Sequence, residues 1–307
     1  MRTSSVLEMT VVMRRFRVYS IMFRKPITMT WRRSVFSARS RSLSGGLEFF
    51  SGSGRVTMQQ DESSGIAVVT LDNPGKKNAL SGSMMAEFEK VTQRLEQWSS
   101  GKAVILSGHG GDFCTGVDLD LVRNILHSEG GQKMSSYLHD LLTQFSNLPL
   151  ISVAVIPGIA VGGGAELTTA CDFRLMTPGS KIGFVQIKMG VVTGFGGGTR
   201  LTRIVGRSQA LRMLCSGKVY RAEESKALGL ADDILSGKDD SVEEAKDWIK
   251  DNFPHNTEMT RQMKKIIIGA SELDSRCSLQ NERDIFVSTW GQPLHLDAVN
   301  SNIKHRE

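Results

Sequence analysis

Hydrophobic and polar residues follow two different rhythms along this chain, and the rhythm changes several times before residue 187. Unbroken apolar runs such as "GIAVVTLD", "KAVILSG" and "LISVAVIPGIAVGGG" are typical of strands buried on both faces of a sheet. The segments "SGSMMAEFEKVTQRLEQWSS" and "YLHDLLTQFSNLP" instead repeat apolar residues at helical spacing. "AELTTACDFRLMT" begins as a helix and passes into a strand. This alternation predicts an α/β domain with parallel strands.

The stretch "SKIGFVQIKMG" contains one polar side chain where its surroundings are apolar. Ile182, Phe184 and Val185 predict a short buried strand with Gln186 at its end. A glycine-rich loop, "TGFGGGTRL", follows immediately. Gln186 is therefore either an ordinary strand-end amide or a replacement for a residue that did chemistry.

Beyond residue 198 the pattern becomes helical. "TRLTRIVGRSQALRMLCSG" and "RAEESKALGL" predict short helices broken by Gly206 and Gly217, and "SVEEAKDWIKDNF", "TEMTRQMKKIIIGA" and "SRCSLQNERDIFVSTW" continue the series. We expect an α/β core at residues 60–200 and a helical region at 201–307. The helical region would close a site on the core, pack against a neighbouring subunit, or both.

Charge changes the picture at the N-terminus. Residues 1–45 contain nine arginines and Lys25 but only one acid, Glu8. Without these ten of the 38 basic residues and one of the 32 acidic residues, the body has 28 basic and 31 acidic residues, a net charge of −3. A nearly neutral body does not favour binding to nucleic acid.

The N-terminal arm is rich in Arg and Ser and nearly free of acids, which is typical of a mitochondrial presequence. Two alternatives stay open. The arm could be a disordered basic extension without a targeting role, or translation could begin at Met29 or Met58 and omit most of it.

Composition excludes several other classes. The sequence has no apolar run of about 18 residues, so it predicts no transmembrane helix. Its cysteines, Cys114, Cys171, Cys215 and Cys277, are widely spaced, which favours reduced intracellular thiols over disulfides or a metal site. No phosphate-binding or dinucleotide-binding glycine motif is present.

The segments "GDFCTGVDL" (111–119) and "GIAVGGGAEL" (158–167) each place small residues directly after a buried strand. Small residues let a ligand approach the backbone N–H groups, and the second segment leads into a helix that we expect to start near Ala165. Side by side, two such loops would form a two-donor oxyanion hole. Taken singly, each is as readily explained as a tight turn that needs glycine.

In order and spacing, "DFCTGVDL", "PLISVAVIPGIAVGGGAELTTACDFRLMTPGSKIGF", "MGVVTGFGGGTRLTRIVG" and "LGLADDIL" resemble the crotonase (enoyl-CoA hydratase/isomerase) superfamily. The resemblance covers about residues 60–290. It implies a spiral of ββα units with a helical C-terminal region, assembly as a homotrimer or homohexamer, and an acyl-CoA thioester substrate. The substrate would carry its own coenzyme A, so we expect no further cofactor. From the residues themselves, as argued above, we expect no metal, no nucleic acid and no membrane.

The resemblance also implies roles for particular residues. The two oxyanion-hole amides fall on Thr115, where alanine is usual, and on Gly163. The first catalytic carboxylate of the hydratases falls on Glu166, and the second falls on Gln186. A proline that is usual before the later glycines is here Thr193.

Further residues match loops and a helix that bind coenzyme A in the superfamily. Asp118 could equally cap the following helix, and Lys264 and Lys265 could equally lie on a solvated face. The predicted coenzyme A contacts are Lys77, Ala79, Leu80, Asp118, Leu119 and Lys265, with Lys264 as a second candidate for the phosphates.

The amide at position 186 bears on the reaction. Hydration of a double bond needs two proton-transferring groups, and Gln186 does not titrate. Decarboxylation of a malonyl-type thioester needs mainly stabilisation of an enolate. Glu166 would position the substrate, protonate the carbanion, or only orient the glycine loop.

Within the superfamily, "GGGAELTTACDFRLMTPGSKIGF", "LQNERD" and "TWGQP" are most similar to the ethylmalonyl-CoA decarboxylases. This implies action on ethylmalonyl-CoA, less on methylmalonyl-CoA, a role in metabolite proofreading, and a cytosolic location that conflicts with the presequence-like arm. The alternatives are an enoyl-CoA isomerase or weak hydratase that uses Glu166 alone, and a non-catalytic relative that binds acyl-CoA or RNA.

Overall fold

The computed structural model describes residues 50–238 and 240–301. The interpretation of residues 1–45 as a presequence or a disordered extension therefore lies outside the described residues. In the described part, single strands or pairs of strands alternate with helices up to β7, and most later elements are helices. The predicted α/β class with a helical C-terminal region is confirmed.

The main sheet has six strands in the order β1-β2-β3-β4-β6-β9. Neighbouring strands are parallel except for the antiparallel pair β1–β2. Every residue of β4 is buried, as an unbroken apolar run predicts. The edge strand β1 alternates exposed residues with buried or partly buried ones and was not predicted. The bounds are β1 (Arg55–Asp61), β2 (Ile66–Asp72), β3 (Ala103–Gly108), β4 (Ile151–Ile156), β6 (Phe173–Met176) and β9 (Asp233–Ile234).

A second sheet has three strands in the order β5-β7-β8. It consists of β5 (Ile159–Val161), β7 (Lys181–Gly183) and β8 (Val219–Arg221). The apolar run "LISVAVIPGIAV" was predicted as one strand, but Pro157 and Gly158 divide it between the two sheets. This break is the geometric basis of the site, because it directs the chain after β5 toward the loop that follows β3.

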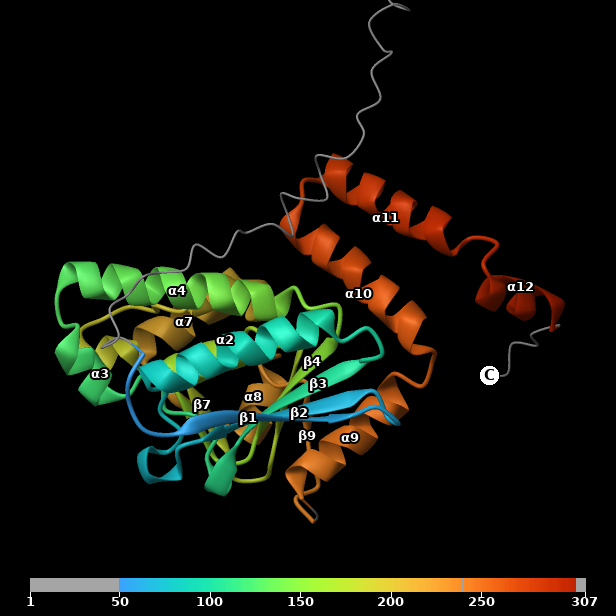
Figure 1. Cartoon of the computed structure of the whole chain (residues 1–307). Coiled ribbons are helices and arrows are strands. Elements are labelled where there is room, and N and C mark those ends of the chain that lie inside the picture. Colours follow the sequence, from blue (N-terminus) through green and yellow to red (C-terminus); the bar gives the residue numbers. More distant parts are fainter. Residues whose placement is uncertain (1–49, 239, 302–307) are drawn as a thin grey trace, which may run out of the picture. The chain divides into compact units, whose positions relative to one another are not determined.

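Helices cover both faces of the main sheet (Figure 1). Alternate side chains of β3 point to opposite faces, so Val104 and Leu106 pack with α2 (Gly82–Gln97) and α4 (Ser128–Ser146). Ala103 and Ile105 instead belong to a smaller core with α9 (Ser241–Asn252). Helix α4 begins well before the predicted segment, and the His127 side chain caps it by accepting a hydrogen bond from the Gly130 N–H.

Helices dominate the C-terminal region, although β8 and β9 interrupt the series that the sequence predicted as helical only. Helix α11 packs along α10, and neither α11 nor α12 contains a buried residue. The helices are α6 (Gly197–Val205), α7 (Arg207–Ser216), α8 (Ala222–Ala227), α9, α10 (Thr257–Glu272), α11 (Ser275–Thr289) and α12 (Pro293–Asn300).

Short helical turns lie in the connections between strands. They are η2 (Pro74–Lys76), η3 (His109–Gly111), α3 (Leu119–Asn124), α5 (Gly163–Thr168) and η4 (Gln186–Met189). Strand β7 ends at Gly183, and Gln186 begins η4. The prediction that Gln186 lies at the end of a strand is therefore wrong, because the chain turns into a 3-10 helix after Phe184 and Val185.

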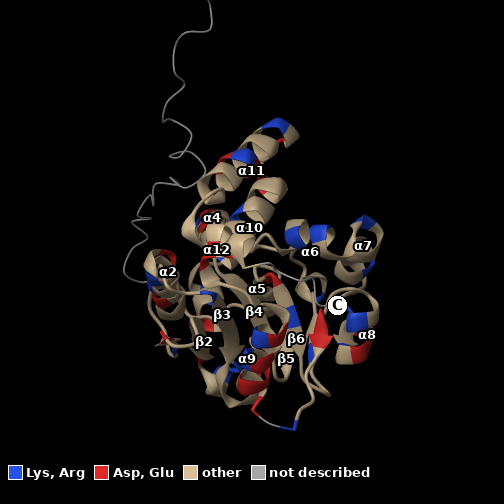
Figure 2. Cartoon of the chain, turned by 90° about the vertical axis from the view of Figure 1, so that its right-hand side faces the viewer, with Lys and Arg blue, Asp and Glu red and all other residues tan. Residues whose placement is uncertain are grey.

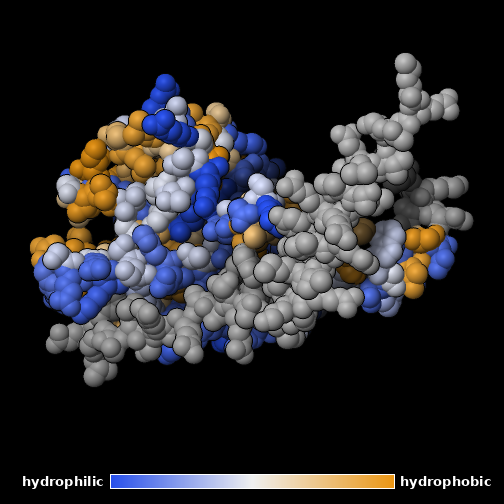
Figure 3. Space-filling view, turned by 90° about the horizontal axis from the view of Figure 1, so that it is seen from above, coloured by the Kyte–Doolittle hydropathy of each residue, from blue (hydrophilic) through white to orange (hydrophobic). Residues whose placement is uncertain are grey.

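The described surface mixes charge and hydrophobicity. Lys and Arg are interspersed with Asp and Glu over the helices and strands (Figure 2), as expected for a nearly neutral body. Hydrophobic residues gather in patches at the left and right ends of the view from above (Figure 3). In the described part of the chain, no helix combines the length and hydrophobicity needed to span a membrane.

Candidate functional site

The loop after β3 and the segment after β4 are joined by backbone hydrogen bonds. The Cys114 N–H donates to the Ile159 carbonyl at 3.1 Å, and the Cys114 carbonyl accepts from the Val161 N–H at 3.1 Å. Cys114 and Ala160 thus form an isolated parallel bridge. The two glycine loops predicted from the sequence therefore lie side by side.

Glycine allows the close approach of these loops at two positions. A Cβ atom at Gly164 would lie 2.0 Å from the Cys114 carbonyl oxygen, closer than any side chain tolerates. Gly116 has φ of 104°, and a Cβ there would lie 3.0 Å from the Gly163 amide nitrogen. The spacing of the two loops thus depends on the absence of side chains at both positions.

The Thr115 and Gly163 N–H groups are available as donors. Among the described residues, neither group donates a hydrogen bond to a protein acceptor. The Thr115 hydroxyl instead donates to the carbonyls of Lys76 at 3.3 Å and Lys77 at 3.4 Å, which anchors the loop. Two adjacent backbone N–H groups without acceptors can stabilise an oxygen that gains negative charge.

Glu166 lies on α5, three residues after Gly163, and its side chain is almost fully buried at 1% exposure. One carboxylate oxygen, Oε1, accepts from the N–H groups of Phe195 at 2.9 Å and Gly197 at 3.0 Å. The other, Oε2, accepts from Gln186 Nε2 at 2.7 Å and from the Gly194 N–H at 3.3 Å. The carboxylate is therefore a fully bonded acceptor at the start of α6.

The structure brings Gln186 and Glu166 into direct contact. Because an ionised carboxylate only accepts hydrogen bonds, the Gln186 amide must present its NH₂ group to Glu166. The carbonyl oxygen, Oε1, then faces the other way. It is buried, and no donor among the described residues reaches it. Gln186 is thus bound through its nitrogen and has an unsatisfied acceptor.

Phe195 and Arg200 complete this arrangement and were not predicted. The Phe195 ring packs so closely on Gly163 that a Cβ there would lie 2.8 Å from two ring carbons. The Arg200 guanidinium donates to Thr169 Oγ1 at 3.1 Å and to the Phe195 carbonyl. Burial lowers the pKa of Arg200, and the charge of Glu166 acts in the opposite direction. The sequence feature that could have revealed both residues is "GFGGGTR", in which an aromatic residue lies among the glycines and an arginine follows them.

Asp118 performs the capping role that the sequence left open. Its carboxylate accepts from the Asp120 N–H at 3.0 Å at the start of α3, and from Lys76 Nζ at 2.6 Å. The hydrogen bond to Asp118 raises the pKa of Lys76. The predicted contact Lys77 instead has Nζ 3.9 Å from Asp112 and a backbone φ of 49°. Lys76, which was not predicted, is the lysine bonded to Asp118.

The other predicted coenzyme A contacts lie around the same loop. The Leu80 N–H donates to the Gly116 carbonyl at 2.7 Å, and the Leu80 carbonyl accepts from the Asp118 N–H at 2.9 Å. Ala79 is buried beside Leu80, whereas Leu119 is half exposed. A polar pocket of about 260 Å³ opens here, lined by Ser51, Gly52, Ser53, Lys76, Ser81, Asp118, Asp120, Leu121 and Asn124.

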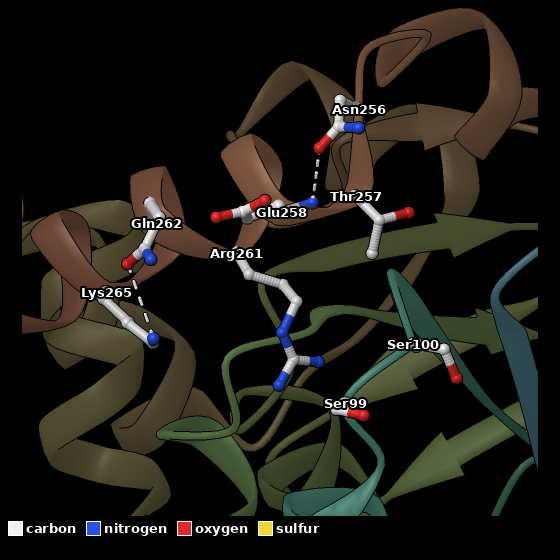
Figure 4. Close-up of a pocket in the computed structure, with 8 residues that line it drawn as sticks. All are labelled: Ser99, Ser100, Asn256, Thr257, Glu258, Arg261, Gln262 and Lys265. Carbon is white, nitrogen blue, oxygen red and sulfur yellow. Dashed lines mark hydrogen bonds between the residues drawn. The ribbon is translucent and has the colours of Figure 1, made fainter. Parts of the chain in front are cut away.

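The two lysines of α10 lie elsewhere. Lys264 is buried and forms an ion pair with Asp172, so the prediction that it reaches coenzyme A phosphates is wrong. Lys265 borders a cleft of about 480 Å³ (Figure 4). The cleft shares no residue with the two loops and is lined by Ser99, Ser100, Asn256, Thr257, Glu258, Arg261, Gln262 and Lys265.

This larger cleft offers little chemistry. Arg261 Nη1 donates to the backbone carbonyls of Trp98 at 3.0 Å and Gly101 at 2.8 Å, so the guanidinium mainly fastens α10 to the end of α2. Within the part of the chain that the structure describes, no group of His, Cys, Asp and Glu is arranged to hold a metal ion. We therefore place the candidate site at the Thr115–Gly163 loops.

Comparison with known proteins identifies the class. Residues 61–295 match the family model described as enoyl-CoA hydratase/isomerase, so the chain belongs to this family. The fold agrees with the crystal structure of an enoyl-CoA hydratase from Bacillus anthracis, with a TM-score of 0.74 and 24% identity over 80% of this chain and 95% of that one. The predicted crotonase-like fold is thereby confirmed.

The curated proteins that the chain matches carry a more specific name than the family model does. The chain is 42% identical over 255 residues to the ethylmalonyl-CoA decarboxylase of Gallus gallus, covering 82% of this chain and 85% of that protein. It is also 42% identical over 257 residues to the ethylmalonyl-CoA decarboxylase of Danio rerio, with the same coverage of 82% and 85%.

Proposed function

We propose that this chain is a carboxy-lyase that removes CO₂ from a malonyl-type acyl-CoA thioester. Its main substrate would be ethylmalonyl-CoA, with methylmalonyl-CoA as a lesser one. The identity of 42% to two ethylmalonyl-CoA decarboxylases supports the assignment. The structural observation that carries the proposal is the pair of N–H donors at Thr115 and Gly163, which have no acceptor within the described part of the chain. They lie near the Glu166 carboxylate, whose two oxygens each already accept two hydrogen bonds.

The reaction begins with cleavage of the bond between the α-carbon and the carboxylate. The electron pair of that bond moves onto the thioester, whose oxygen becomes an enolate oxygen. The Thr115 and Gly163 N–H groups would donate to this oxygen, and one such donor is worth roughly 10²–10³ in rate. A proton then replaces CO₂ on the α-carbon. No second carboxylate is needed, and one beside the departing group would repel it.

Hydration fits the site less well. It needs one group to activate water and another to deliver a proton, and Gln186 can do neither. An isomerase acting through Glu166 alone would need a free carboxylate oxygen, yet both oxygens already accept two hydrogen bonds. The nearly neutral body, in which Lys and Arg are interspersed with Asp and Glu along the chain (Figure 2), argues against an RNA-binding relative.

The wider role follows from this chemistry. The enzyme would destroy side products of acyl-CoA carboxylases, which is a form of metabolite proofreading, and it would do so in the cytosol as a homotrimer or homohexamer. The presequence-like composition of residues 1–45 instead favours the mitochondrial matrix. Sequencing the N-terminus of the endogenous protein distinguishes a retained arm from a removed one.

The activity test uses the purified full chain with ethylmalonyl-CoA and methylmalonyl-CoA in separate reactions. We expect CO₂ release and the corresponding saturated acyl-CoA from both, with a higher kcat/KM for the ethyl compound. Release of no CO₂ from either thioester would overturn the proposal. Faster turnover of a 3-enoyl-CoA to its 2-enoyl isomer would favour the isomerase.

A further inference from the structure

The Glu166 carboxylate has no free position for a proton. A carboxylate offers about four lone-pair sites, and here Oε1 and Oε2 each accept two hydrogen bonds. Three of the four donors are backbone N–H groups, which cannot be turned into acceptors. A proton on Glu166 would therefore either break one of the buried hydrogen bonds to the turn at residues 194–197 or require the Gln186 side chain to rotate and present its Oε1.

The same bonds fix the position of an aromatic ring. Phe195 is 2% exposed, its N–H donates to Glu166 Oε1 at 2.9 Å, and its ring packs against Gly163. Gly197 approaches Glu166 so closely that a Cβ there would lie 2.3 Å from Glu166 Cγ. The carboxylate, the turn and the ring therefore form one continuous contact path to an oxyanion-hole amide.

Arg200 supports the turn from its other side. Its guanidinium donates to the Phe195 carbonyl, while the Phe195 N–H donates to Glu166. The peptide groups on both sides of the Phe195 α-carbon are thus bonded to charged side chains. Hydrogen bonds to charged groups are stronger than those between neutral groups. Such bonding holds a backbone segment more firmly than the turn's glycines would allow unaided.

We propose that Glu166 is a positioning residue and not the proton donor of the reaction. Its carboxylate holds the turn at residues 194–197, so that the Phe195 ring fixes Gly163, whose N–H faces the enolate. The inference deepens the proposed function and rests on it. The proton on the α-carbon comes from water: the enolate takes a proton from H₂O, and the hydroxide left combines with the released CO₂ as bicarbonate.

The first test compares Glu166→Gln with Glu166→Ala. The new amide keeps an oxygen for the Phe195 and Gly197 N–H groups, and its NH₂ can donate to Gln186 after that side chain rotates to present its unsatisfied Oε1. Only the hydrogen bond from the Gly194 N–H, the longest of the four at 3.3 Å, is lost. We expect Glu166→Gln to keep kcat within about tenfold of wild type, whereas Glu166→Ala loses roughly 10²–10³, the cost of an oxyanion-hole donor.

Proton transfer by Glu166 gives a different result. An amide cannot transfer protons, so Glu166→Gln would then lose about 10²–10⁴ in kcat, as much as Glu166→Ala. Equal losses in two folded variants would overturn the proposal. Glu243→Gln, a change of the same kind at an exposed residue of α9, serves as the matched control and should retain wild-type kcat.

Phe195→Leu provides a second test that leaves the carboxylate and its backbone bonds in place. Removing the ring frees Gly163, so we expect kcat to fall at least tenfold while KM changes less than threefold, because transition-state contact is lost and ground-state binding is kept. If Phe195→Leu has the kcat of wild type, the ring does not transmit the effect of Glu166 and the proposal fails.

Amide hydrogen exchange provides a readout that needs no substrate. The Phe195 and Gly197 N–H groups should be as protected in Glu166→Gln as in wild type, and less protected in Glu166→Ala or, should that variant not fold, in Glu166→Leu. Unchanged protection in the apolar variants would overturn the positioning role. A wild-type protein that releases no CO₂ would instead refute the proposed function and leave the exchange result to decide the inference.

Discussion

Gln186 Nε2 lies 2.7 Å from Glu166 Oε2, so a second carboxylate at position 186 would have to share a proton with the first. Gln186 avoids that coupling, because its NH₂ group donates to Glu166 without adding charge. The candidate site consequently contains one carboxylate, where the resemblance to the hydratases implies two. The sequence pattern located this difference, but only the structure shows the amide and the carboxylate in contact.

Gln186→Glu should introduce a pH dependence. At low pH the two carboxyl groups share one proton and keep their hydrogen bond. At higher pH the second ionisation places two negative charges together, close to the substrate carboxylate, and should reduce kcat/KM for decarboxylation. The measurement is the ratio of variant to wild-type kcat/KM from pH 5.5 to 8.5. We expect the ratio to fall as pH rises; a constant ratio would show that position 186 does not face the reaction.

At the scale of elements, the candidate site lies after the ends of β3 and β5, and glycine sets the distance between the two loops. Gly164→Ala should push these loops apart, since the added Cβ would lie 2.0 Å from the Cys114 carbonyl oxygen. We expect kcat to fall by roughly 10² or more and the free energy of unfolding to fall by about 1–3 kcal/mol.

Gly131→Ala is the matched control for that change. Gly131 lies in α4, and a Cβ there would meet no atom within 4 Å. The substitution should therefore leave kcat unchanged and raise the free energy of unfolding by about 0.5–1 kcal/mol through helix propensity. Urea unfolding and CO₂ release measured on both variants check the pair; wild-type activity in Gly164→Ala would show that loop spacing is not critical.

The start of α3 offers a further prediction. Asp118→Ala removes a side chain that accepts from the Asp120 N–H and from Lys76, and it should lower the free energy of unfolding by about 1–2 kcal/mol. Asp118→Asn keeps the cap and should recover about half of that loss. Thermal or urea unfolding distinguishes the two variants, and equal losses would mean that the cap contributes nothing.

Some of these elements could be predicted from sequence and others could not. The strand Ile151–Ile156 is buried on both faces, so its unbroken apolar run was sufficient. The loops at Thr115 and Gly163 follow buried strands and are rich in small residues, which is also a local signal. The contact of Phe195 with Gly163 has no such signal, because nothing in the spacing of a glycine-rich loop tells which strand exit it covers.

Contacts between residues that are distant in the sequence, and local backbone conformation, explain the other residues whose roles were not predicted. The local sequence shows Lys264 only as one of two neighbouring lysines on a helix. In the structure it is buried, because Asp172, far away in the sequence, supplies its counter-charge. Lys76 and Lys77 are adjacent, and the turn that gives Lys77 a φ of 49° decides that Lys76 contacts Asp118. Backbone direction and partner position come from the fold, so residue type and spacing could not assign these roles.

At the scale of the whole molecule, two buried thiols link stability to pH. Burial raises the pKa of Cys114 and of Cys171 to about 12, from an ordinary value of 9.0. Burial also raises the pKa of Tyr137. Above pH 9 the unfolded chain loses these thiol protons before the folded chain does. Their stabilising contribution is therefore complete below about pH 9 and is lost as pH rises toward 12.

The predicted slope is steep enough to measure. Each thiol should lower the free energy of unfolding by about 1.4 kcal/mol per pH unit above pH 9. The comparison is urea unfolding of wild type and of the double variant Cys114→Ala, Cys171→Ala at pH 7.5, 9 and 10.5, since other titrating groups contribute equally to both. The variant should show the shallower pH dependence; parallel curves would contradict the linkage.

The reaction itself is tested most directly by two rates on one preparation of the full chain. These are kcat/KM for CO₂ release from ethylmalonyl-CoA and kcat/KM for hydration of a short 2-enoyl-CoA. Donors at Thr115 and Gly163, a bonded Glu166 and an amide at position 186 predict that decarboxylation is faster by roughly 10² or more, the minimum usual cost of a missing acid–base group. Hydration as fast as decarboxylation, or faster, would contradict the assignment.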